Sequence, residues 1–594
     1  MYNASDIFDD ESFNEYLEEI KKYSAVNNYY GMQVTVHGRS GWYYDTFKLA
    51  NTDIETIKCA SVSDIGCGTF YNCIKLSSAE FMTSNQYNEK SFIINDYAFY
   101  NCIELQQFTT VGGYYKIGKE AFANCYKLST ITGLLNNIGF IDDCAFENCY
   151  SLNAFIQLNA SVSMYSIGSN AFKNCYNIQG YVGTFTKFIG RRAFYNCSSL
   201  SVFVVSPSSY MSIIIDDEAL AKTNISNVNI TPNVSYIGNK CFAECYNLET
   251  ATLSGCDYIG DSIFYKCSKL SIIELNDLFY VRSSAFTSLS NLWYISLPKV
   301  IDIGADVFKD CIGLSAISTG QCYLPLCEEI ESTTFANCNN IAYISLPNLK
   351  QLPDDTFCND HTYSMSKISY IDLGNCVSIG NWNFYKCSLL GLSSIISING
   401  NCRYIGHHAF GYTGISLFYL GSFGYSFGIN NVLSIGSYAF EHCSRLGRID
   451  FSKCAYIGEH AFDGCTPSLI FLQKITKFPD GFSEEGHKFI NTFLISIDYM
   501  YKVSSSYFKN APSLSYVYLN NCSIIEDDAF YGCSKLQTIN LQGDHLVSLK
   551  SINAFNNCNS DYCISVYSSL YSLYITDSVW GLISSHIYSV SKFG

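Results

Sequence analysis

The sequence has few charged residues, and basic residues are the scarcer kind. Asp, Glu, Lys and Arg make up 15% of its 594 residues, well below the roughly 25% of an average soluble domain. The 36 basic residues face 52 acidic ones, for a formal charge of −16, and they form no run. Because a nucleic-acid-binding surface needs clustered Lys and Arg, we do not expect nucleic acid as a partner.

Two further absences concern membranes and export. No stretch of 18 or more residues is apolar throughout, and the most apolar one, 564–583, is interrupted by Ser and by Asp577. We therefore expect no transmembrane segment. The start, residues 1–22, is rich in Asp and Glu, whereas a secretory signal needs a basic start followed by an apolar core. We expect no such signal.

One motif is repeated along the chain. The pattern Ile-Gly-x-x-Ala-Phe-x-x-Cys-x-x-Leu has clear copies that begin at Ile117, Ile167, Ile237 and Ile435. Anchored on its Phe, we count 21 units between residues 70 and 555, with a mean spacing of about 24 residues. A repeat of this length indicates a solenoid, in which each unit stacks on its neighbours.

Each unit has a simple physical interpretation. Alternating apolar residues after the Cys, as in 292–297, predict a short strand with one buried face. The Ile marks the point where the chain turns back toward the next unit, and Gly permits that turn. An acid in place of Gly, as at Asp142, can cap a helical turn that contains Ala-Phe. The Phe and Leu side chains point inward. One unit cannot bury its own apolar face, but a stack of units can.

The repeated pattern resembles the BspA-like branch of the leucine-rich repeats over roughly residues 54–566. The resemblance implies an α/β repeat solenoid of about 21 units, a right-handed superhelix with a parallel sheet on the concave face and short helical turns on the convex face. It also implies a role like that of family members associated with surface proteins of bacteria and anaerobic protists, which bind host or matrix proteins. Leu220 replaces the anchor Phe in one unit, and Thr223 and Thr413 are among the replacements of the Cys.

The two ends differ from the repeat and are interpreted as caps. Residues 1–53 form the expected N-terminal cap, with an amphipathic helix at 10–24 and strands at 32–36 and 42–49. Residues 54–566 form the repeat array. Residues 567–594 form the expected C-terminal cap, with a last strand at 571–575 and a short helix that Asp577 caps and that contains Trp580.

The 28 cysteines fall mostly into repeat columns. Fifteen lie three residues after the anchor Phe, where a small apolar thiol suits a tight interior. No Cys-x-x-Cys occurs, so zinc-knuckle and thioredoxin-like sites are excluded. We expect buried free thiols and hence a reducing, cytoplasmic location. The alternative is the cell surface or secretion by a non-classical route, as in family members.

Sequence motifs for catalysis are weak, and we do not expect an enzyme, a cofactor or a metal. Gly-x-Ser-x-Gly occurs once, around Ser426, but within a Gly- and aromatic-rich insertion rather than between a long strand and a helix. His407, His408, His442 and His460 are the one histidine concentration, and they fall at different positions of their units. We interpret them as residues of solvated turns.

What remains is a surface on the expected concave face. The residues that flank the central Ile of each strand should point outward there, and Tyr is common among them. Tyr offers a large contact area at a small entropic cost, although it can also serve only to solubilise a sheet. The candidate ligand-binding residues are Tyr294, Ser296, Tyr343, Ser345, Tyr370, Asp372, Tyr419, Arg448, Asp450, Tyr516 and Tyr518.

The sequence thus favours a non-catalytic protein that binds a protein ligand, or alternatively a glycan, through its concave face. The alternative is an intracellular structural scaffold that binds through its caps or convex turns. The oligomeric state and the identity of the ligand are left open.

Overall fold

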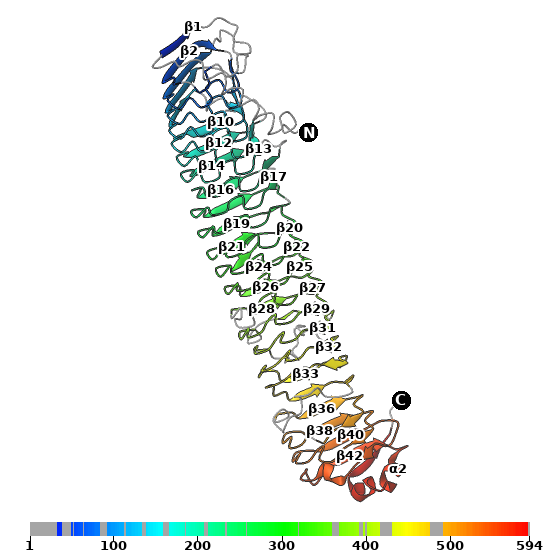
Figure 1. Cartoon of the computed structure of the whole chain (residues 1–594). Helices are drawn as coiled ribbons and strands as arrows, with labels where there is room; N and C mark the ends of the chain where they lie inside the picture. Colours follow the sequence, from blue (N-terminus) through cyan, green and yellow to red (C-terminus); the bar gives the residue numbers. More distant parts are fainter. Residues whose placement is uncertain are drawn as a thin grey trace. The chain divides into compact units, whose positions relative to one another are not determined.

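A computed structural model describes most of the chain as a parallel β-solenoid (Figure 1). It describes residues 33–591 apart from 38–48, 52, 63, 84–91, 112–114, 134–137, 159–164, 185, 207–211, 232–233, 257, 319, 359–366, 391–395, 398–400, 416–430, 476–490 and 506. The chain divides into unit 1, Met1–Leu297, and unit 2, Pro298–Gly594.

Most coils place one strand in a first ladder, which follows Cys-x-x-Leu, and one in a second ladder, which ends at the Ile of Ile-Gly. A turn segment from that Gly to the Cys joins them. In unit 1, β12, β14 and β16 lie along one side of the stack and β13 and β17 along the other (Figure 1). The described residues form about 19 coils. The expected anchor Phe482 lies outside them.

The strands of unit 1 belong to these two ladders. The first ladder contains β1 (Gln33–His37), β2 (Thr56–Val62), β4 (Ser78–Thr83), β6 (Gln107–Val111), β8 (Thr130–Thr132), β10 (Phe155–Leu158), β12 (Gly180–Thr184), β14 (Val202–Ser206), β16 (Asn227–Ile230), β18 (Thr250–Leu253), β19 (Ile272–Glu274) and β21 (Tyr294–Ser296). The second ladder contains β3 (Asp64–Ile65), β5 (Phe92–Ile94), β7 (Tyr115–Ile117), β9 (Ile138–Ile141), β11 (Tyr165–Ile167), β13 (Thr186–Ile189), β15 (Ile213–Ile215), β17 (Val234–Ile237) and β20 (Tyr280–Val281).

Unit 2 repeats the arrangement with shorter strands. Its first ladder contains β23 (Ala316–Ile317), β24 (Cys322–Tyr323), β26 (Tyr343–Ser345), β28 (Tyr370–Asp372), β30 (Ile396–Ser397), β33 (Arg448–Asp450), β35 (Leu469–Phe471), β36 (Leu494–Ile497), β38 (Tyr516–Leu519), β40 (Thr538–Leu541), β42 (Cys563–Tyr567) and β43 (Ile587–Val590). Its second ladder contains β22 (Asp302–Ile303), β25 (Glu329–Ile330), β27 (Gln351–Leu352), β29 (Ser378–Ile379), β31 (Tyr404–Ile405), β32 (Ser434–Ile435), β34 (Tyr456–Ile457), β37 (Lys502–Val503), β39 (Ile524–Ile525) and β41 (Ser548–Leu549).

The anchor Phe residues form a column of stacked rings in the interior. Phe122, Phe146 and Phe172 are fully buried. Their ring centroids follow one another at 5.1 Å, with the ring planes within 4° of parallel. Such aromatic pairs contribute about 0.5–1.5 kcal/mol beyond the burial of their area. The predicted solenoid with an inward Phe column is confirmed.

The turn segments are not helical, which refines the prediction. The N–H groups of Phe172 and Asn174 donate to the carbonyls of Ala193 and Tyr195 in the next coil, at 2.7 and 2.9 Å. The N–H of Cys175 instead bonds within its own coil, to Phe172. A helix would use all these donors within one segment. Here alternate donors join the coils, and within the described residues helix is limited to η2 (Ile552–Phe555), α2 (Tyr571–Thr576) and η3 (Trp580–His586).

The Gly of Ile-Gly is required by close stacking rather than by its backbone dihedral angles. A Cβ on Gly168 would lie 2.5 Å from the backbone of Asp142 and Asp143 in the preceding coil. The acids near this position do not cap a helix either. The Asp143 carboxylate accepts the N–H of Ser169 in the next coil at 2.6 Å, so it also joins neighbouring coils.

The C-terminal cap differs in part from its prediction. The expected strand at 571–575 was wrong, because these residues form α2, whose Tyr574 is fully buried against Trp580. Asp577 does cap the following segment, since its carboxylate accepts the N–H groups of Val579 and Trp580. The last strand is β43, which pairs with β42. None of the helices in the described ranges is long and apolar enough to cross a membrane.

The N-terminal cap is described only in part. The expected strand at 32–36 is β1, which pairs in parallel with β2. The expected helix at 10–24 lies outside the described residues, as does nearly all of the expected strand at 42–49.

Candidate interaction surface

The strands of the first ladder turn one row of side chains inward and two rows outward. In β28, Ile371 is fully buried while Tyr370 and Asp372, on either side of it, are half-buried. This is the alternation expected of a pleated strand with one face in the core. The outward side of the first ladder, which we call the ladder face, contains most of the candidate ligand-binding residues.

Tyr343 and Tyr370 are the most closely associated of these residues. They pair in register on β26 and β28, and their rings stack with centroids 4.1 Å apart and planes 6° from parallel. Ser345 is buried and donates a hydrogen bond to the Asp372 carboxylate at 3.0 Å. Tyr323, which the sequence did not single out, pairs with Ser345 in register and is 36% exposed.

Tyr294 and Ser296 lie in unit 1, on β21. Tyr294 is half-buried, but Ser296 is buried and donates to the side-chain oxygen of Asn276 at 2.6 Å. Ala316 on β23, which lies between Tyr294 and Tyr343 in sequence, is also buried. Ser296 and Ala316 therefore offer little surface to a ligand.

The remaining candidates lie further along unit 2. The Arg448 guanidinium forms an ion pair with Asp450 and lies 4.7 Å from the ring centroid of Phe471 on the adjacent strand β35. Tyr516 donates to the side chain of Gln537 at 2.6 Å, and Tyr518 is half-buried. Tyr419 lies outside the described residues.

The histidine concentration is organised rather than dispersed. Trp382, His408, Tyr438 and His460 occupy the same turn position in four coils, and their rings stack in that order with centroids 3.8, 4.8 and 4.9 Å apart. His408 and His460 are half-buried on their turns, whereas His407 and His442 are exposed. His408 also contacts the Glu441 carboxylate at 2.6 Å. Although these rings differ in size, they stack nearly parallel at one position of successive coils, as the Phe rings do.

The described residues contain no arrangement that supports the catalytic or metal-binding candidates. Ser426 lies outside the described residues. In the part of the chain that the structure describes, no three His, Cys, Asp or Glu side chains are grouped as metal ligands would be.

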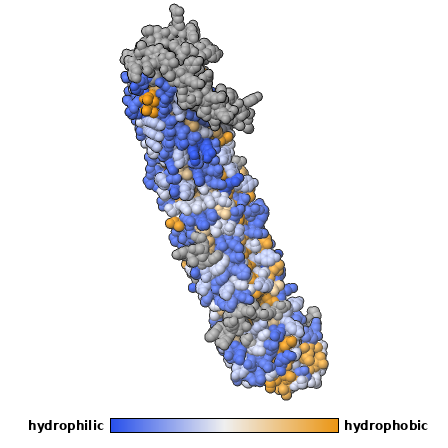
Figure 2. Space-filling view, viewed as in Figure 1, coloured by the Kyte–Doolittle hydropathy of each residue, from blue (hydrophilic) through white to orange (hydrophobic). Residues whose placement is uncertain are grey.

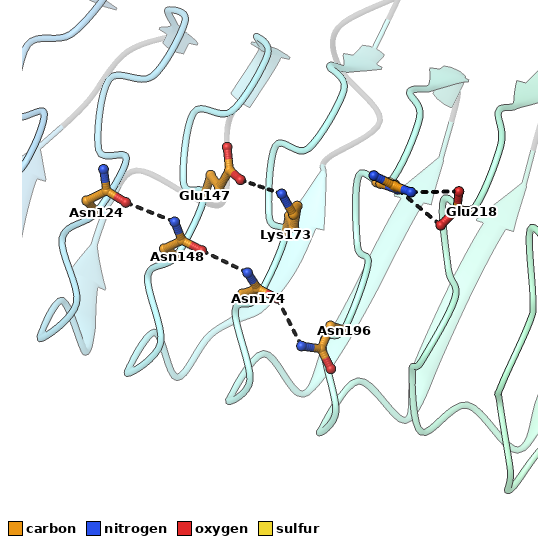
Figure 3. A network of polar contacts seen from close by, with 8 residues as sticks. Asn124, Glu147, Asn148, Lys173, Asn174, Asn196 and Glu218 are labelled. Atoms are coloured by element: carbon orange, nitrogen blue, oxygen red, sulfur yellow. Dashed lines mark hydrogen bonds and ion pairs between the residues drawn. The ribbon is translucent and has the colours of Figure 1, made fainter.

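A ladder of asparagine amides joins successive turn segments of unit 1 (Figure 3). The amide nitrogen of Asn148 donates to Asn124, that of Asn174 to Asn148, and that of Asn196 to Asn174, at 2.8–2.9 Å. These residues have φ near +60°, which Asn tolerates better than other residues with a side chain. Sequence reasoning missed this ladder, although the recurring dipeptide Asn-Cys was its signal.

The cysteine column is a second ladder of side-chain hydrogen bonds. The thiols of Cys102, Cys125 and Cys149 each donate to the carbonyl of the anchor Phe in the preceding coil, at 3.0–3.2 Å. Burial raises the pKa of the Cys102 and Cys149 thiols well above its ordinary value. The Thr residues that replace Cys also donate to carbonyls, as Thr223 does to Leu220. Most positions of the column therefore hold a small side chain that can donate, whereas Leu289 and Ala511 are buried there without a side-chain donor.

The side of the molecule drawn in Figure 2 is mainly polar. Apolar atoms gather at the end of unit 2 that carries α2 and η3, where Leu573 and Leu582 are 50% and 69% exposed. These two leucines form a small apolar surface on the C-terminal cap.

Comparison with known proteins identifies the repeat. The family described as the BspA type leucine rich repeat region matches residues 42–179, 187–315, 318–430, 418–521 and 501–576. The chain belongs to this family. The matched ranges cover most of both units, so the resemblance drawn from the repeated motif is confirmed.

The chain is also similar to solved structures of leucine-rich repeat proteins. A leucine-rich repeat protein from Bacteroides ovatus is 21% identical over 73% of this chain and 82% of its own, with a TM-score of 0.35. A leucine rich cell surface protein from Faecalibacterium prausnitzii is 16% identical over 93% of each chain, with a TM-score of 0.21. No curated protein matches the chain significantly in sequence.

Proposed function

We propose that this BspA-type repeat protein is a non-catalytic binding module that holds a protein ligand on the ladder face. The observation that carries the proposal is the stacked pair Tyr343 and Tyr370, whose rings are half-buried and face outward from a rigid sheet. Aromatic side chains held in place before binding lose little entropy on contact, which is why Tyr is enriched at binding hot spots.

The stacking of coils supports the same use. The strands of the ladder face are held by backbone hydrogen bonds to their neighbours and by buried apolar residues, such as Ile371. Outward side chains can therefore vary without disturbing the core, and neighbouring positions lie at the regular strand spacing of about 4.8 Å. Such an extended surface suits a protein ligand better than a small molecule, which needs a pocket. The alternative ligand, a glycan, would bind the same tyrosines of the ladder face.

The second candidate is a structural scaffold that binds through its turns or caps. Two observations favour it. Tyr126, Tyr150 and Tyr176 form an exposed stack on the turn segments, with centroids 5.1 and 5.2 Å apart. Leu573 and Leu582 form the exposed apolar surface of the C-terminal cap.

Site-specific photo-cross-linking in the native cell separates the two candidates. A benzoylphenylalanine is placed at Tyr343 on the ladder face, at Tyr150 on the turns, or at Leu582 on the cap. We expect a discrete cross-linked protein from position 343 that the other two positions do not give. Cross-links from 150 or 582 alone would support the scaffold and remove the ladder-face proposal.

We also propose a reducing, cytoplasmic location, with the cell surface as the alternative. The support is the thiol column, in which side chains such as Cys125 use their S–H group as a hydrogen-bond donor. Oxidation to a disulfide would remove that donor. Localisation of the tagged protein in its native cell, with alkylation of thiols at lysis, tests this directly.

A further inference from the structure

The Tyr343 and Tyr370 pair lies beside a carboxylate that lacks a counter-ion. Asp372 is half-buried on β28, and its oxygens accept hydrogen bonds from the Ser345 hydroxyl at 3.0 Å and the Gly374 N–H at 3.1 Å. Both of these donors are neutral. Among the described residues, the ion pairs of unit 2 involve other acids, such as Glu328 and Asp450, and none reaches Asp372. The carboxylate therefore keeps its charge unpaired at the ladder face.

The described strands next to Asp372 carry aromatic rings but neither Lys nor Arg. Strands β23, β24, β26 and β28 hold the outward residues Tyr323, Tyr343 and Tyr370 beside Asp372, and no Lys or Arg occurs in these strands. A ring face attracts a cation through its quadrupole, and an adjacent carboxylate adds a charge-assisted hydrogen bond. The combination of both selects a cation over a neutral group.

Unit 2 itself contains a cation held in this way. On β33 the Arg448 guanidinium pairs with Asp450 and lies 4.7 Å from the Phe471 ring centroid. Asp450 follows the buried Ile449 as Asp372 follows Ile371, so the two acids occupy the same position of their strands. At β28 the acid and the rings are present, but the chain supplies no base in that strand.

The same chemistry recurs in unit 1. Glu274 on β19 is half-buried, accepts a hydrogen bond from Thr252 at 3.1 Å, and follows Ile273 in the same strand position. Tyr294 lies on the adjacent strand β21. Within the described residues, none of the ion pairs of unit 1 reaches Glu274.

We propose that the ladder face recognises a basic segment of its protein partner, with an Arg or Lys side chain of that segment against the Tyr343 and Tyr370 rings and Asp372 as its counter-ion. The inference rests on the proposed function and names the chemistry of the ligand. The net charge of −16 favours approach of such a segment.

The test uses a defined probe. A fluorescein-labelled peptide, Gly-Ser-Arg-Gly-Arg-Ser-Gly, is titrated with the full chain at low salt, and binding is followed by anisotropy. The matched probe replaces both arginines by citrulline, which keeps the shape and removes the charge. We expect the arginine peptide to bind at least about tenfold more tightly, and its affinity to fall as salt is added.

Variants then locate the binding. E274Q/D372N should weaken the arginine peptide about tenfold and leave the citrulline peptide unchanged. E459Q/D527N removes the same number of charges from exposed acids on the turn segments and should leave the arginine peptide nearly unchanged. Y343F/Y370F keeps the rings and should retain binding, whereas Y343S/Y370S should lose it. Circular dichroism and thermal unfolding verify that each variant is folded.

Three outcomes would overturn the inference. These are equal affinity for the two peptides, no binding of the arginine peptide at millimolar concentration, or equal losses in E274Q/D372N and E459Q/D527N. A partner that cross-links to position 343 but binds E274Q/D372N as tightly as the parent chain would leave the proposed function standing and would reject the basic segment alone.

Discussion

The thiol of Cys175 donates a hydrogen bond to the carbonyl of Phe146, the anchor of the preceding coil, over 3.1 Å. The same carbonyl accepts the N–H of Cys149, also at 3.1 Å. Cysteine at this position therefore has two roles, since it fills a small buried space and it joins one coil to the next. At position 223 the column has Thr instead, whose hydroxyl donates to the Leu220 carbonyl of its own coil and lies 3.3 Å from the Cys245 thiol of the next coil.

We predict that Cys175→Ala destabilises the coils around it by about 1–3 kcal/mol, because the substitution removes a buried donor and leaves a small cavity. Cys175→Ser keeps a donor and should lose less. Hydrogen exchange of the amides between 146 and 197 measures the local effect, with Cys67→Ala, at a half-buried turn position, as the control. Equal losses for the Ala and Ser variants would argue that packing alone selects the thiol.

The raised thiol pKa values predict a loss of stability in alkali. Burial raises the pKa of Cys102 and Cys149 well above the ordinary 9.0. The folded chain therefore keeps these protons at a pH where the unfolded chain has released them. Stability from this source is complete below about pH 9 and decreases as the pH rises above it. Urea midpoints measured from pH 7 to pH 10 should fall only above about 9, and a midpoint that is constant through pH 10 would contradict the buried column.

Thiol labelling gives an independent measurement. In guanidinium chloride without reductant, most of the 28 cysteines should react with a thiol reagent, whereas the native chain should react slowly because the column is buried. Burial raises even the pKa of Cys376 to about 11, so few thiolates are present at neutral pH. Rapid labelling of the native chain would contradict the buried column, and oxidation of most cysteines as isolated from the cell would reverse the proposed location.

Much of the fold could be predicted from the sequence because its interior repeats one residue type at one position. The Phe column and the buried Ile rows follow from that repetition. The second ladder was not predicted, since strands such as β32, with two residues, are too short to show alternation. The turns were expected to be helical because the family resemblance implies helical turns on the convex face, and sequence alone does not reveal that alternate N–H groups bond to the next coil.

The candidate surface was predictable only in part. Tyr343 and Tyr370 lie where alternation places them. Ser296 is buried because Asn276, which follows strand β19 in the preceding coil, covers its hydroxyl, and such a contact between distant segments leaves no mark on the periodicity. The asparagine ladder had a sequence signal, but its meaning depends on the positive φ of residues such as Asn174.

Because Asn174 has a positive φ, its substitution by Ala or by Gly distinguishes the free energy of the amide hydrogen bonds from the cost of backbone strain. Asn174 has a φ of 62° and bonds to Asn148 and Asn196. Asn174→Ala should lose the amide bonds and strain the backbone, for about 2–3 kcal/mol in total. Asn174→Gly relieves the strain and should lose about half as much, as Gly464 and Gly532 suggest by holding the equivalent position with φ of 70° and 76°. Thermal unfolding of the two variants measures the difference, and a more stable Ala variant would refute it.

A substitution in the Phe column tests whether each coil is stabilised mainly by the two coils next to it. Phe242 is fully buried and stacks on Phe264 with centroids 5.6 Å apart. Phe242→Ala should cost about 3–5 kcal/mol and should speed hydrogen exchange in the coils on either side of it, with little change far along the unit. Val202→Ala, at an exposed position of β14, serves as the control. The same acceleration in every coil of unit 1 would contradict a nearest-neighbour solenoid.

The last prediction concerns the binding role of the ladder-face tyrosines. Replacing Tyr294, Tyr343 and Tyr370 together by Ser should leave the chain folded, because these side chains are outside the core and each is only half-buried. If the tyrosines form a hot spot, the affinity for the protein that cross-links to position 343 should fall by at least about 2 kcal/mol.

The matched control replaces Tyr126, Tyr150 and Tyr176, an equal number of exposed tyrosines on the turn segments, and should leave that affinity unchanged. Isothermal titration with the purified partner measures both variants. Retained affinity in the folded ladder-face variant, with a loss in the turn variant, would mean that the ladder-face tyrosines only solubilise the sheet. Binding would then belong to the turns.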